Sequence, residues 1–196
     1  MKKIILASSS QSRKKIFKNV GLNFLSISPK IDEEKEKKII KNNKKKISAK
    51  EITKKLCRLK CKSISNMFKD RFVVGCDTMI EHKKKNIDKA KTIQDAEKKI
   101  FLLSGSSHFI YTSVCVYKDQ KKIWEHTEKT KVFIRPLTKK EVKKYIKKCG
   151  KQILNSVGCY QAEKMGPQIF SKIDGDFYNV LGFPIIPFIN FLVKRK

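Results

Sequence analysis

Hydrophobic residues along the chain fall into runs that predict an alternation of strands and helices. Residues 4–7 form a short apolar run typical of a strand, and residues 47–67 repeat apolar positions at the spacing of an amphipathic helix. Residues 72–76 form a continuous apolar run, which is typical of a buried central strand. We expect this strand to end at Asp77 and Thr78.

The second half of the chain predicts a helix, a long hairpin and two further helices. Capped helices are expected over 92–103 and over 138–148, the second of which opens with a Thr-x-x-Glu capping box. Between them, the β-rich runs 108–117 and 123–134 are separated by a polar turn and predict an antiparallel hairpin. A last apolar helix begins near Pro184. This order of elements predicts a mixed α/β protein with helices packed on a central sheet.

Residues 30–46 interrupt the pattern because most of them are charged. We expect a loop or mobile segment there rather than a regular element. Within it, residues 31–33 form an acidic island that contains Glu33.

The composition limits the class of protein. A chain of 196 residues suits one domain, or two lobes that share a core. The formal net charge of +29 would by itself indicate nucleic acid or an anionic membrane surface as a partner. However, only five of the 47 basic residues are arginine, and the lysines are scattered along the chain. Because arginine is the residue of bidentate base and phosphate recognition, a nucleic-acid partner is disfavoured.

The cysteines and the apolar runs bear on the compartment. The chain has six cysteines, and no pair has the Cys-x-x-Cys spacing of a zinc or redox site. The apolar runs at 4–7 and 182–193 are too short for a signal peptide and a membrane span, respectively. We therefore expect a reduced, cytoplasmic protein without a membrane partner, whose free thiols act as small hydrophobic groups.

The N-terminal strand runs into a cluster of hydroxyl groups and then into a cationic helix start. Ser8, Ser9 and Ser10 follow the apolar run, and Arg13 comes next in the predicted helix. The unpaired N–H groups and partial positive charge of a helix N-terminus attract anions, and the hydroxyls and Arg13 add donors. A phosphate site is one interpretation of this segment. A surface helix capped by serine is the other.

Asp77 is the strongest single candidate for chemistry because it lies beside Thr78 where the buried strand is expected to end. Ligand-binding groups gather at strand ends in such sheets, and a carboxylate there can hold a divalent metal or take a proton from water. The alternative is an aspartate that turns the chain after a strand. Position alone does not separate Lys60, Lys89 and Glu33 from solvated surface residues.

A set of short motifs, taken in order, resembles the Maf family of nucleoside triphosphate pyrophosphatases from about residue 4 to residue 192. Each motif is weak alone, and the strength of the resemblance lies in their common order and register. The motifs are Leu-Ala-Ser-Ser-Ser-Gln-Ser-Arg at 6–13, Ile-Asp-Glu at 31–33, Leu-Cys-Arg-Leu-Lys-Cys at 56–61, Gly-Cys-Asp-Thr at 75–78, Asp-Lys-Ala at 88–90, Leu-Ser-Gly-Ser-Ser-His at 103–108, Gly-Cys-Tyr-Gln-Ala-Glu at 158–163 and the segment 175–184.

This resemblance implies an elongated α/β fold, in which a mixed sheet with flanking helices forms two lobes around a central cleft within a single domain over 1–196. It implies hydrolysis of the α–β phosphoanhydride of a nucleoside triphosphate, giving the monophosphate and pyrophosphate. The expected cofactor is a divalent cation, Mg, Mn or Co. Because family members are commonly dimers, the resemblance also implies a possible homodimer.

The resemblance further implies roles for eight residues, whose charges and hydroxyl groups suit a tetra-anionic substrate. Catalysis is assigned to Asp77, Lys60 and Glu33, with Asp77 and Glu33 also as metal ligands. The substrate is expected to contact Ser8, Arg13, Thr78, Lys89 and Glu163.

The identity of residue 163, a glutamate, bears on which nucleotide base the protein prefers. The pyrimidine-preferring branch of the family carries Gln at this position, whereas a carboxylate only accepts hydrogen bonds and suits the N–H donors of guanine. The chain therefore resembles the branch that acts on 7-methyl-GTP. It departs from the family at Gln11 and Ala90, which replace prolines, and at Ser12, which replaces an arginine. The lost guanidinium bears on nucleotide affinity and base preference.

Two other functions remain open from the sequence. The first is a basic nucleic-acid-binding or regulatory protein with vestigial catalysis, which would bind oligonucleotides with an affinity that falls steeply as salt rises. The second is arrest of cell division through a protein partner, consistent with the family's association with septum formation. No feature of the sequence identifies such a partner.

Overall fold

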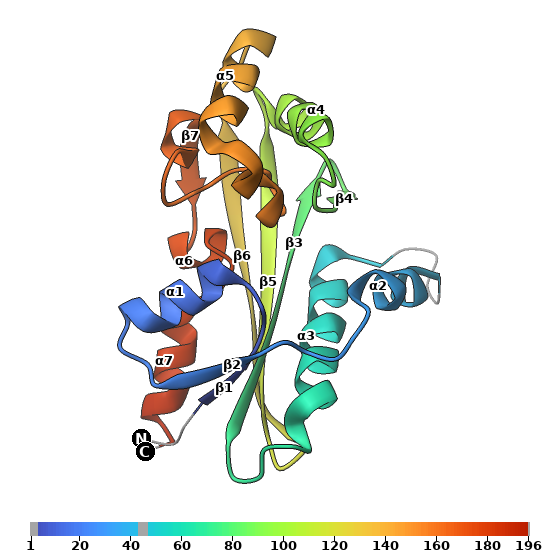
Figure 1. Cartoon of the computed structure of the whole chain (residues 1–196), viewed down its shortest axis with the longest axis vertical. Helices are drawn as coiled ribbons and strands as arrows, with labels where there is room; N and C mark the ends of the chain where they lie inside the picture. Colours follow the sequence, from blue (N-terminus) through green and yellow to red (C-terminus); the bar gives the residue numbers. More distant parts are fainter. Residues whose placement is uncertain (1–3, 43–46, 196) are drawn as a thin grey trace.

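The structure is a computed structural model that describes residues 4–42 and 47–195 and has an α/β fold. A mixed sheet of seven strands runs along the elongated molecule, with helices packed on it (Figure 1). The fold class predicted from the sequence is confirmed. The strands are β1 (Ile4–Ala7), β2 (Phe24–Ile27), β3 (Phe72–His82), β4 (Lys85–Ile87), β5 (Ser107–Lys118), β6 (Lys121–Ile134) and β7 (Phe170–Asp174).

The sheet changes from parallel to antiparallel at β3. Its order is β2-β1-β3-β5-β6-β7, and β4 pairs with β3 outside this path. Strand β1 is parallel to both β2 and β3, whereas β5, β6 and β7 follow in antiparallel order. Because β1 ends at Ala7, opposite Gly75, the rest of β3 extends beyond its parallel neighbour.

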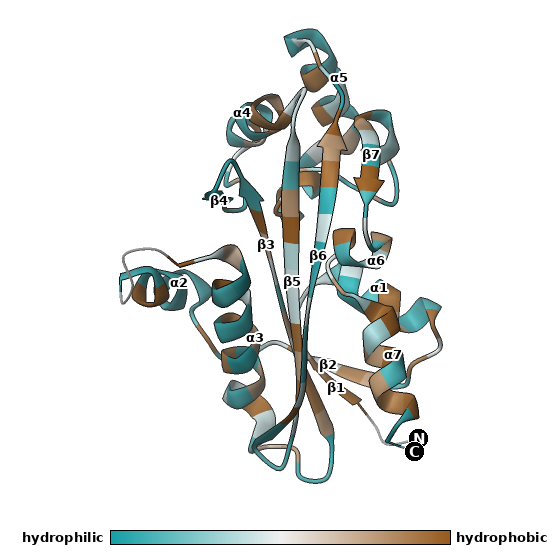
Figure 2. Ribbon diagram, turned by 180° about the vertical axis from the view of Figure 1, so that it is seen from behind, coloured by the Kyte–Doolittle hydropathy of each residue, from teal (hydrophilic) through white to brown (hydrophobic). Residues whose placement is uncertain are grey.

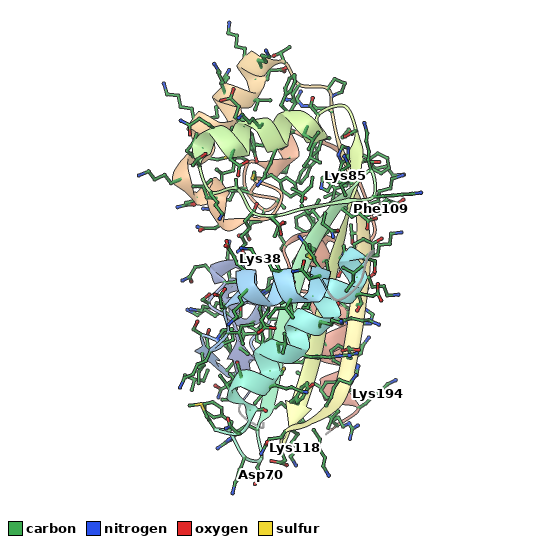
Figure 3. All side chains as sticks on the ribbon, turned by 90° about the vertical axis from the view of Figure 1, so that its right-hand side faces the viewer. Lys38, Asp70, Lys85, Phe109, Lys118 and Lys194 are labelled. Atoms are coloured by element: carbon green, nitrogen blue, oxygen red, sulfur yellow. The ribbon has the colours of Figure 1, made fainter. Side chains whose placement is uncertain are left out.

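The predicted hairpin is confirmed, and its strands are longer than expected. Strands β5 and β6 pair from Ser107 to the turn, which contains Asp119 and Gln120. Both turn residues have left-handed φ angles, 48° and 63°, as the tight turns of hairpins require. The labelled Lys118 marks this turn at one end of the molecule (Figure 3).

Seven α-helices and two short 3-10 helices complete the described part of the chain. Each predicted helix over 92–103, 138–148 and from Pro184 is present, with Thr92 and Thr138 as caps. The helices are α1 (Gln11–Asn19), α2 (Glu33–Asn42), α3 (Ala49–Ser65), α4 (Ile93–Leu103), α5 (Lys139–Cys149), η1 (Gly150–Asn155), η2 (Gly166–Gln168), α6 (Phe177–Val180) and α7 (Ile185–Val193).

Two groups of helices cover the same face of the sheet at its two ends. Residues of α4 and α5 pack with Ile110 and Val132 in one apolar cluster, and residues of α1 and α7 pack with Leu6 and Val74 in another. Helix α3 packs on the opposite face, on β1, β3 and β5. Figure 1 shows the two groups separated along the sheet, and the brown ribbon of α7 in Figure 2 reflects its apolar sequence. The fold thus has two lobes joined by the long central strands.

The prediction of a loop over 30–46 is wrong for the helical residues of α2, and residues 43–46 lie outside the described part of the chain. Glutamates in the first turn of α2 favour its N-terminus electrostatically. One apolar side chain, Ile40, is buried against Ile52 and Leu56 of α3. Ion pairs add to this apolar contact, since Glu33 pairs with Lys60, and two lysines of α2 pair with Asp88.

The prediction that β3 ends at Asp77 is also wrong. Strand β3 continues to His82 because β5 pairs with it residue by residue as far as Glu81. Asp77 therefore lies within a strand, two residues beyond the point at which β1 stops beside Gly75. The strand end nearest to Asp77 in the sheet is therefore the end of β1, not the end of β3. The sequence patterns did not reveal β4, β7, α6 or the two 3-10 helices.

Candidate active site

A cavity of about 620 Å³ lies between the two lobes. Its walls come from the turn between β1 and α1, the middle of β3, the start of α2 and the segment 152–164. All eight residues predicted to form a site line this one cavity: Ser8, Arg13, Glu33, Lys60, Asp77, Thr78, Lys89 and Glu163.

The turn from β1 to α1 brings a helix N-terminus to the cavity wall. Ser10 is the N-cap of α1, and its side chain accepts a hydrogen bond from the backbone N–H of Arg13. The Ser8 hydroxyl accepts a bond from the N–H of Ser10 at 3.2 Å. The first residues of the helix, Gln11 and Ser12, also line the cavity. The positive end of the helix dipole therefore faces a space with room for an anion.

Arg13 links three parts of the site. Its side chain is buried and donates to the Ser8 hydroxyl at 3.3 Å, to the Thr78 hydroxyl at 3.0 Å and to the carbonyl oxygen of Gly182 at 2.9 Å. The planar guanidinium suits these three acceptors at once, which an ammonium group on a flexible chain does not. Arg13 thus fixes the hydroxyl of Ser8, which follows β1, and that of Thr78 in β3 relative to the segment before α7.

Lys60 of α3 lies between two carboxylates. Its ammonium donates to Oδ1 of Asp77 at 2.8 Å and lies 3.0 Å from Oε2 of Glu33. Lys60 and Asp77 are each only 4% exposed, whereas the Glu33 side chain is 46% exposed. Removing one member of such a buried pair leaves an uncompensated charge, at a cost of about 3–5 kcal/mol.

Gly75 allows α3 to approach β3 closely enough for this pairing. A Cβ atom at Gly75 would overlap the carbonyl oxygen of Cys57 and lie 2.8 Å from Sγ of Cys61. Both cysteines belong to α3 and are fully buried. Gly75 and the two small cysteine side chains of α3 therefore set how closely the ammonium of Lys60 approaches the carboxylate of Asp77.

The charges in the cavity shift the pKa values of three groups. Burial opposes the charged form of Lys60, but the attraction of Asp77 prevails and raises the pKa of Lys60. Partial burial likewise opposes ionisation of Glu33, yet the Lys60 ammonium lowers the pKa of this carboxyl group. The pKa of Lys89 is lowered, first by loss of hydration and then by the charge of Arg13. Lys60 and Glu33 are thus held in their charged forms.

One oxygen of the central carboxylate has no hydrogen-bond partner. Oδ2 of Asp77 is buried and accepts no hydrogen bond from the residues that the structure describes. No group of three or more His, Cys, Asp or Glu side chains that could hold a metal occurs among residues 4–42 and 47–195. The available acidic set is Asp77 with Glu33, and two carboxylates are what Mg²⁺ commonly takes from a protein when phosphate oxygens and water supply its other ligands.

The cavity carries more positive than negative side chains. Six lining residues are basic and three are acidic, a net of three positive charges: Arg13, Lys15, Lys37, Lys60, Lys89 and Lys164 against Glu33, Asp77 and Glu163. Three of these residues, Lys15, Lys37 and Lys164, were not among the predicted site residues. A signal existed only for Lys15, which lies one helical turn after Gln11 at the predicted anion site.

Glu163 belongs to the segment 152–164 of the cavity wall and has a basic partner. Its Oε2 accepts a hydrogen bond from the Lys15 ammonium at 2.9 Å. The segment that carries Glu163 is held in part by Gln161, whose backbone N–H donates to the Tyr145 hydroxyl at 3.2 Å. Nearby His108 is buried and within 2.9 Å of the Tyr160 hydroxyl, so it serves the packing of this lobe.

The fold and the cavity define an α/β protein whose interlobe site suits an anionic ligand and presents a buried carboxylate to it. The chain belongs to the Maf family: the family described as Maf-like protein matches residues 3–195. The family assignment made from the ordered motifs is therefore confirmed.

Several curated relatives align with nearly the whole chain. A protein of Bartonella quintana named 7-methyl-GTP pyrophosphatase is 35% identical over 95% of this chain and 92% of its own length. A protein of Hyphomonas neptunium named nucleoside triphosphate pyrophosphatase is 32% identical over 98% and 96%, respectively. Among solved structures, the Staphylococcus aureus Ham1 protein aligns with a TM-score of 0.39 and 14% identity, over 67% of this chain and 70% of that one.

Two further sequence-based expectations can be compared with the described residues. No helix within 4–42 and 47–195 is long and apolar enough to cross a membrane. All six cysteines are free and buried. Cys57 and Cys61, which lie one helical turn apart, are buried in the contact between α3 and the sheet, as two small apolar residues would be.

Proposed function

We propose that this protein is a nucleoside triphosphate pyrophosphatase, which hydrolyses its substrate to the nucleoside monophosphate and pyrophosphate. The observation that carries the proposal is the buried Lys60–Asp77 pair beside Arg13, in one cationic cavity. The names of the relatives from Bartonella quintana and Hyphomonas neptunium support the same reaction.

The cationic groups of the cavity would bind the triphosphate. Arg13 and the N-terminus of α1 lie on one wall, and Lys60 and Lys89 lie on the same cavity surface. Because Ser8 and Thr78 orient Arg13, and two carboxylates orient Lys60, these two groups need little reorganisation when negative charge develops in the transition state.

Asp77 would take the proton of the attacking water. The oxygen of water forms a bond to the α phosphorus, the bond from this phosphorus to the α–β bridging oxygen breaks, and its electron pair leaves with pyrophosphate. The free Oδ2 of Asp77 is the one buried carboxylate oxygen in the described cavity without a hydrogen bond, while Oδ1 is held by Lys60. The carboxylate is thereby oriented for proton transfer.

A divalent cation fits the donor set of this site. Asp77 and Glu33 would hold it, since both are hard oxygen ligands that line the cavity. When bound, the cation would neutralise part of the negative charge of the phosphate groups. The same carboxylates hold Lys60, so the lysine keeps them close together when no cation is present.

Modified purine nucleotides are the proposed substrate class. Glu163 lines the cavity and is the residue predicted to accept N–H donors of a guanine-type base. The Bartonella quintana relative is named for 7-methyl-GTP, which supports this class. We also propose that the protein acts in the cytoplasm, because six free buried thiols suit a reducing compartment.

The test is a panel of nucleoside triphosphates that includes GTP, 7-methyl-GTP, UTP and dTTP, with released pyrophosphate as the readout and Mg²⁺, Mn²⁺ or Co²⁺ added in turn. We expect metal-dependent pyrophosphate release, with the purine nucleotides preferred. Absence of turnover with every nucleotide and metal would contradict the proposal. Strong, salt-sensitive oligonucleotide binding in that case would favour the nucleic-acid alternative.

Replacing Arg13 by lysine is expected to lower kcat/KM about 10- to 100-fold, which corresponds to about 1.4–2.8 kcal/mol. Lysine keeps the positive charge, but it cannot bond Ser8, Thr78 and Gly182 from one rigid plane. Steady-state kinetics measure the change. Arg135→Lys is the matched control because Arg135 is exposed and lies outside this cavity. Equal losses in the two variants would show that Arg13 has no special role.

The lowered pKa of Lys89 predicts the alkaline limit of activity. Burial opposes the charged form of Lys89, the nearby cations Arg13 and Lys60 repel its ammonium, and the attraction of Glu33 does not offset these effects on the pKa. Lys89 therefore loses its charge, and with it the attraction for phosphate, below the ordinary lysine value of about 10.4. In Lys89→Arg the charge persists, so the alkaline limb of the pH profile of kcat/KM should move upward. Lys91→Arg should leave the limb in place; a shift in this control but not in Lys89→Arg would refute the assignment.

A further inference from the structure

Lys15 and Glu163 form an ion pair between two walls of the cavity, and neither residue is one of the predicted catalytic residues. Lys15 of α1 and Glu163 of the opposite segment are 148 residues apart in the chain, and their charged atoms are 2.9 Å apart. Both residues line the cavity. Their side chains are 52% and 31% exposed, so the pair is hydrated and can open at low cost.

The pairing changes what Glu163 offers to a ligand. A free carboxylate presents a full negative charge, which favours a cationic base over a neutral one. Here one oxygen, Oε2, already faces the Lys15 ammonium. A neutral base can donate an N–H group to the remaining lone pairs while Lys15 stays in place. A base that is itself a cation must share the carboxylate with Lys15 or displace it.

We propose that Lys15 sets the base preference of the cavity by competing with cationic bases for Glu163. The ligand class concerned is purine nucleotides, and the distinction is between neutral guanine and 7-methylguanine, whose ring carries a positive charge. Lys15 is a positioning residue in this account, since it acts through Glu163. The inference rests on the proposed function for the identity of the ligand, but not on the hydrolysis step.

The test is the binding of two monophosphates, GMP and 7-methyl-GMP, to the full-length protein by calorimetry without metal. In Lys15→Met, the ratio of the affinity for 7-methyl-GMP to that for GMP should rise about two- to fivefold, or about 0.4–1 kcal/mol. In Lys15→Arg, which keeps the ion pair, the ratio should stay at the wild-type value. Lys14→Met is the matched control, because Lys14 is adjacent on α1 and lies outside the cavity lining.

Three results would overturn the proposal: an unchanged or lower ratio in Lys15→Met, the same rise in Lys14→Met, or no binding of either monophosphate to any variant. A general electrostatic effect would appear equally in both methionine variants, since each removes one positive charge. Failure of the proposed function is distinguishable, because a protein that lacks turnover but shows the expected affinity ratios would keep the role of Lys15 and lose the catalytic assignment.

Discussion

Replacing Asp77 by asparagine is expected to reduce pyrophosphate release about 10²- to 10⁴-fold, the range for loss of a general base. Asparagine keeps an oxygen that can accept the bond from Lys60, which Asp77 accepts at 2.8 Å. It removes the negative charge and the basic Oδ2 that lies buried without a hydrogen bond. The measurement is steady-state pyrophosphate release, with circular dichroism to establish that the fold is retained.

Asp174→Asn is the matched control for this variant. It is the same chemical change on an exposed position of β7, outside the cavity. We expect activity close to that of the wild-type protein. Normal turnover in a folded Asp77→Asn variant would exclude Asp77 as the catalytic carboxylate.

Replacing Gly75 by alanine is expected to lower the free energy of unfolding by about 3 kcal/mol, the upper part of the range for overpacking. The added methyl group meets the backbone carbonyl of Cys57, which cannot rotate away as the end of a side chain would. Helix α3 must therefore shift, and with it Lys60. The melting temperature should fall by about 6–12 °C, and kcat should fall with it.

Two further variants test whether the backbone contact with Cys57 is what destabilises Gly75→Ala. Adding Cys61→Ala to Gly75→Ala should not restore stability, because Sγ of Cys61 is only the second contact. A Cβ atom at Gly21 would meet no described atom within 4 Å, but the φ of 69° there is strained for alanine. Gly21→Ala should therefore lower the free energy of unfolding by only about 1–2 kcal/mol and leave activity intact. Full stability of Gly75→Ala would show that α3 is not held against β3 at this point.

Local signals in the sequence predicted most of the helices and the hairpin. The capping box fixes the start of α5, because the side chains of Thr138 and Glu141 each accept a hydrogen bond from the other's backbone N–H. The hairpin was predictable because two β-rich runs flank a short polar segment, 118–121. These signals lie within a few residues of each other, so they need no knowledge of the tertiary structure.

The errors arose where tertiary contacts decide the structure. Helix α2 is stabilised by the contact of Ile40 with α3, which no local pattern reveals. Strand β3 runs past Asp77 because β5 continues to pair with it. The end of β1 beside Gly75 leaves residues 76–79 of β3, Asp77 among them, without a paired strand on that side before β4 pairs at Ile80.

The candidate site was predictable mainly through the family resemblance. The eight predicted residues line one cavity, although they come from segments between Ser8 and Glu163. Lys37 and Lys164 were missed because a chain so rich in lysine gives no local reason to prefer one lysine over another. The labelled Lys38, Lys85, Lys118 and Lys194 in Figure 3 project at separate places on the molecule. The homodimer, the single domain over 1–196 and the link to cell division stay predictions.

The most direct test of the central claim is the identity of the products, measured by phosphorus NMR with 7-methyl-GTP or GTP and a divalent cation. Cleavage between the α and β phosphates predicts the nucleoside monophosphate and pyrophosphate in equal amounts. Formation of the diphosphate and orthophosphate, or no reaction at all, would contradict the account.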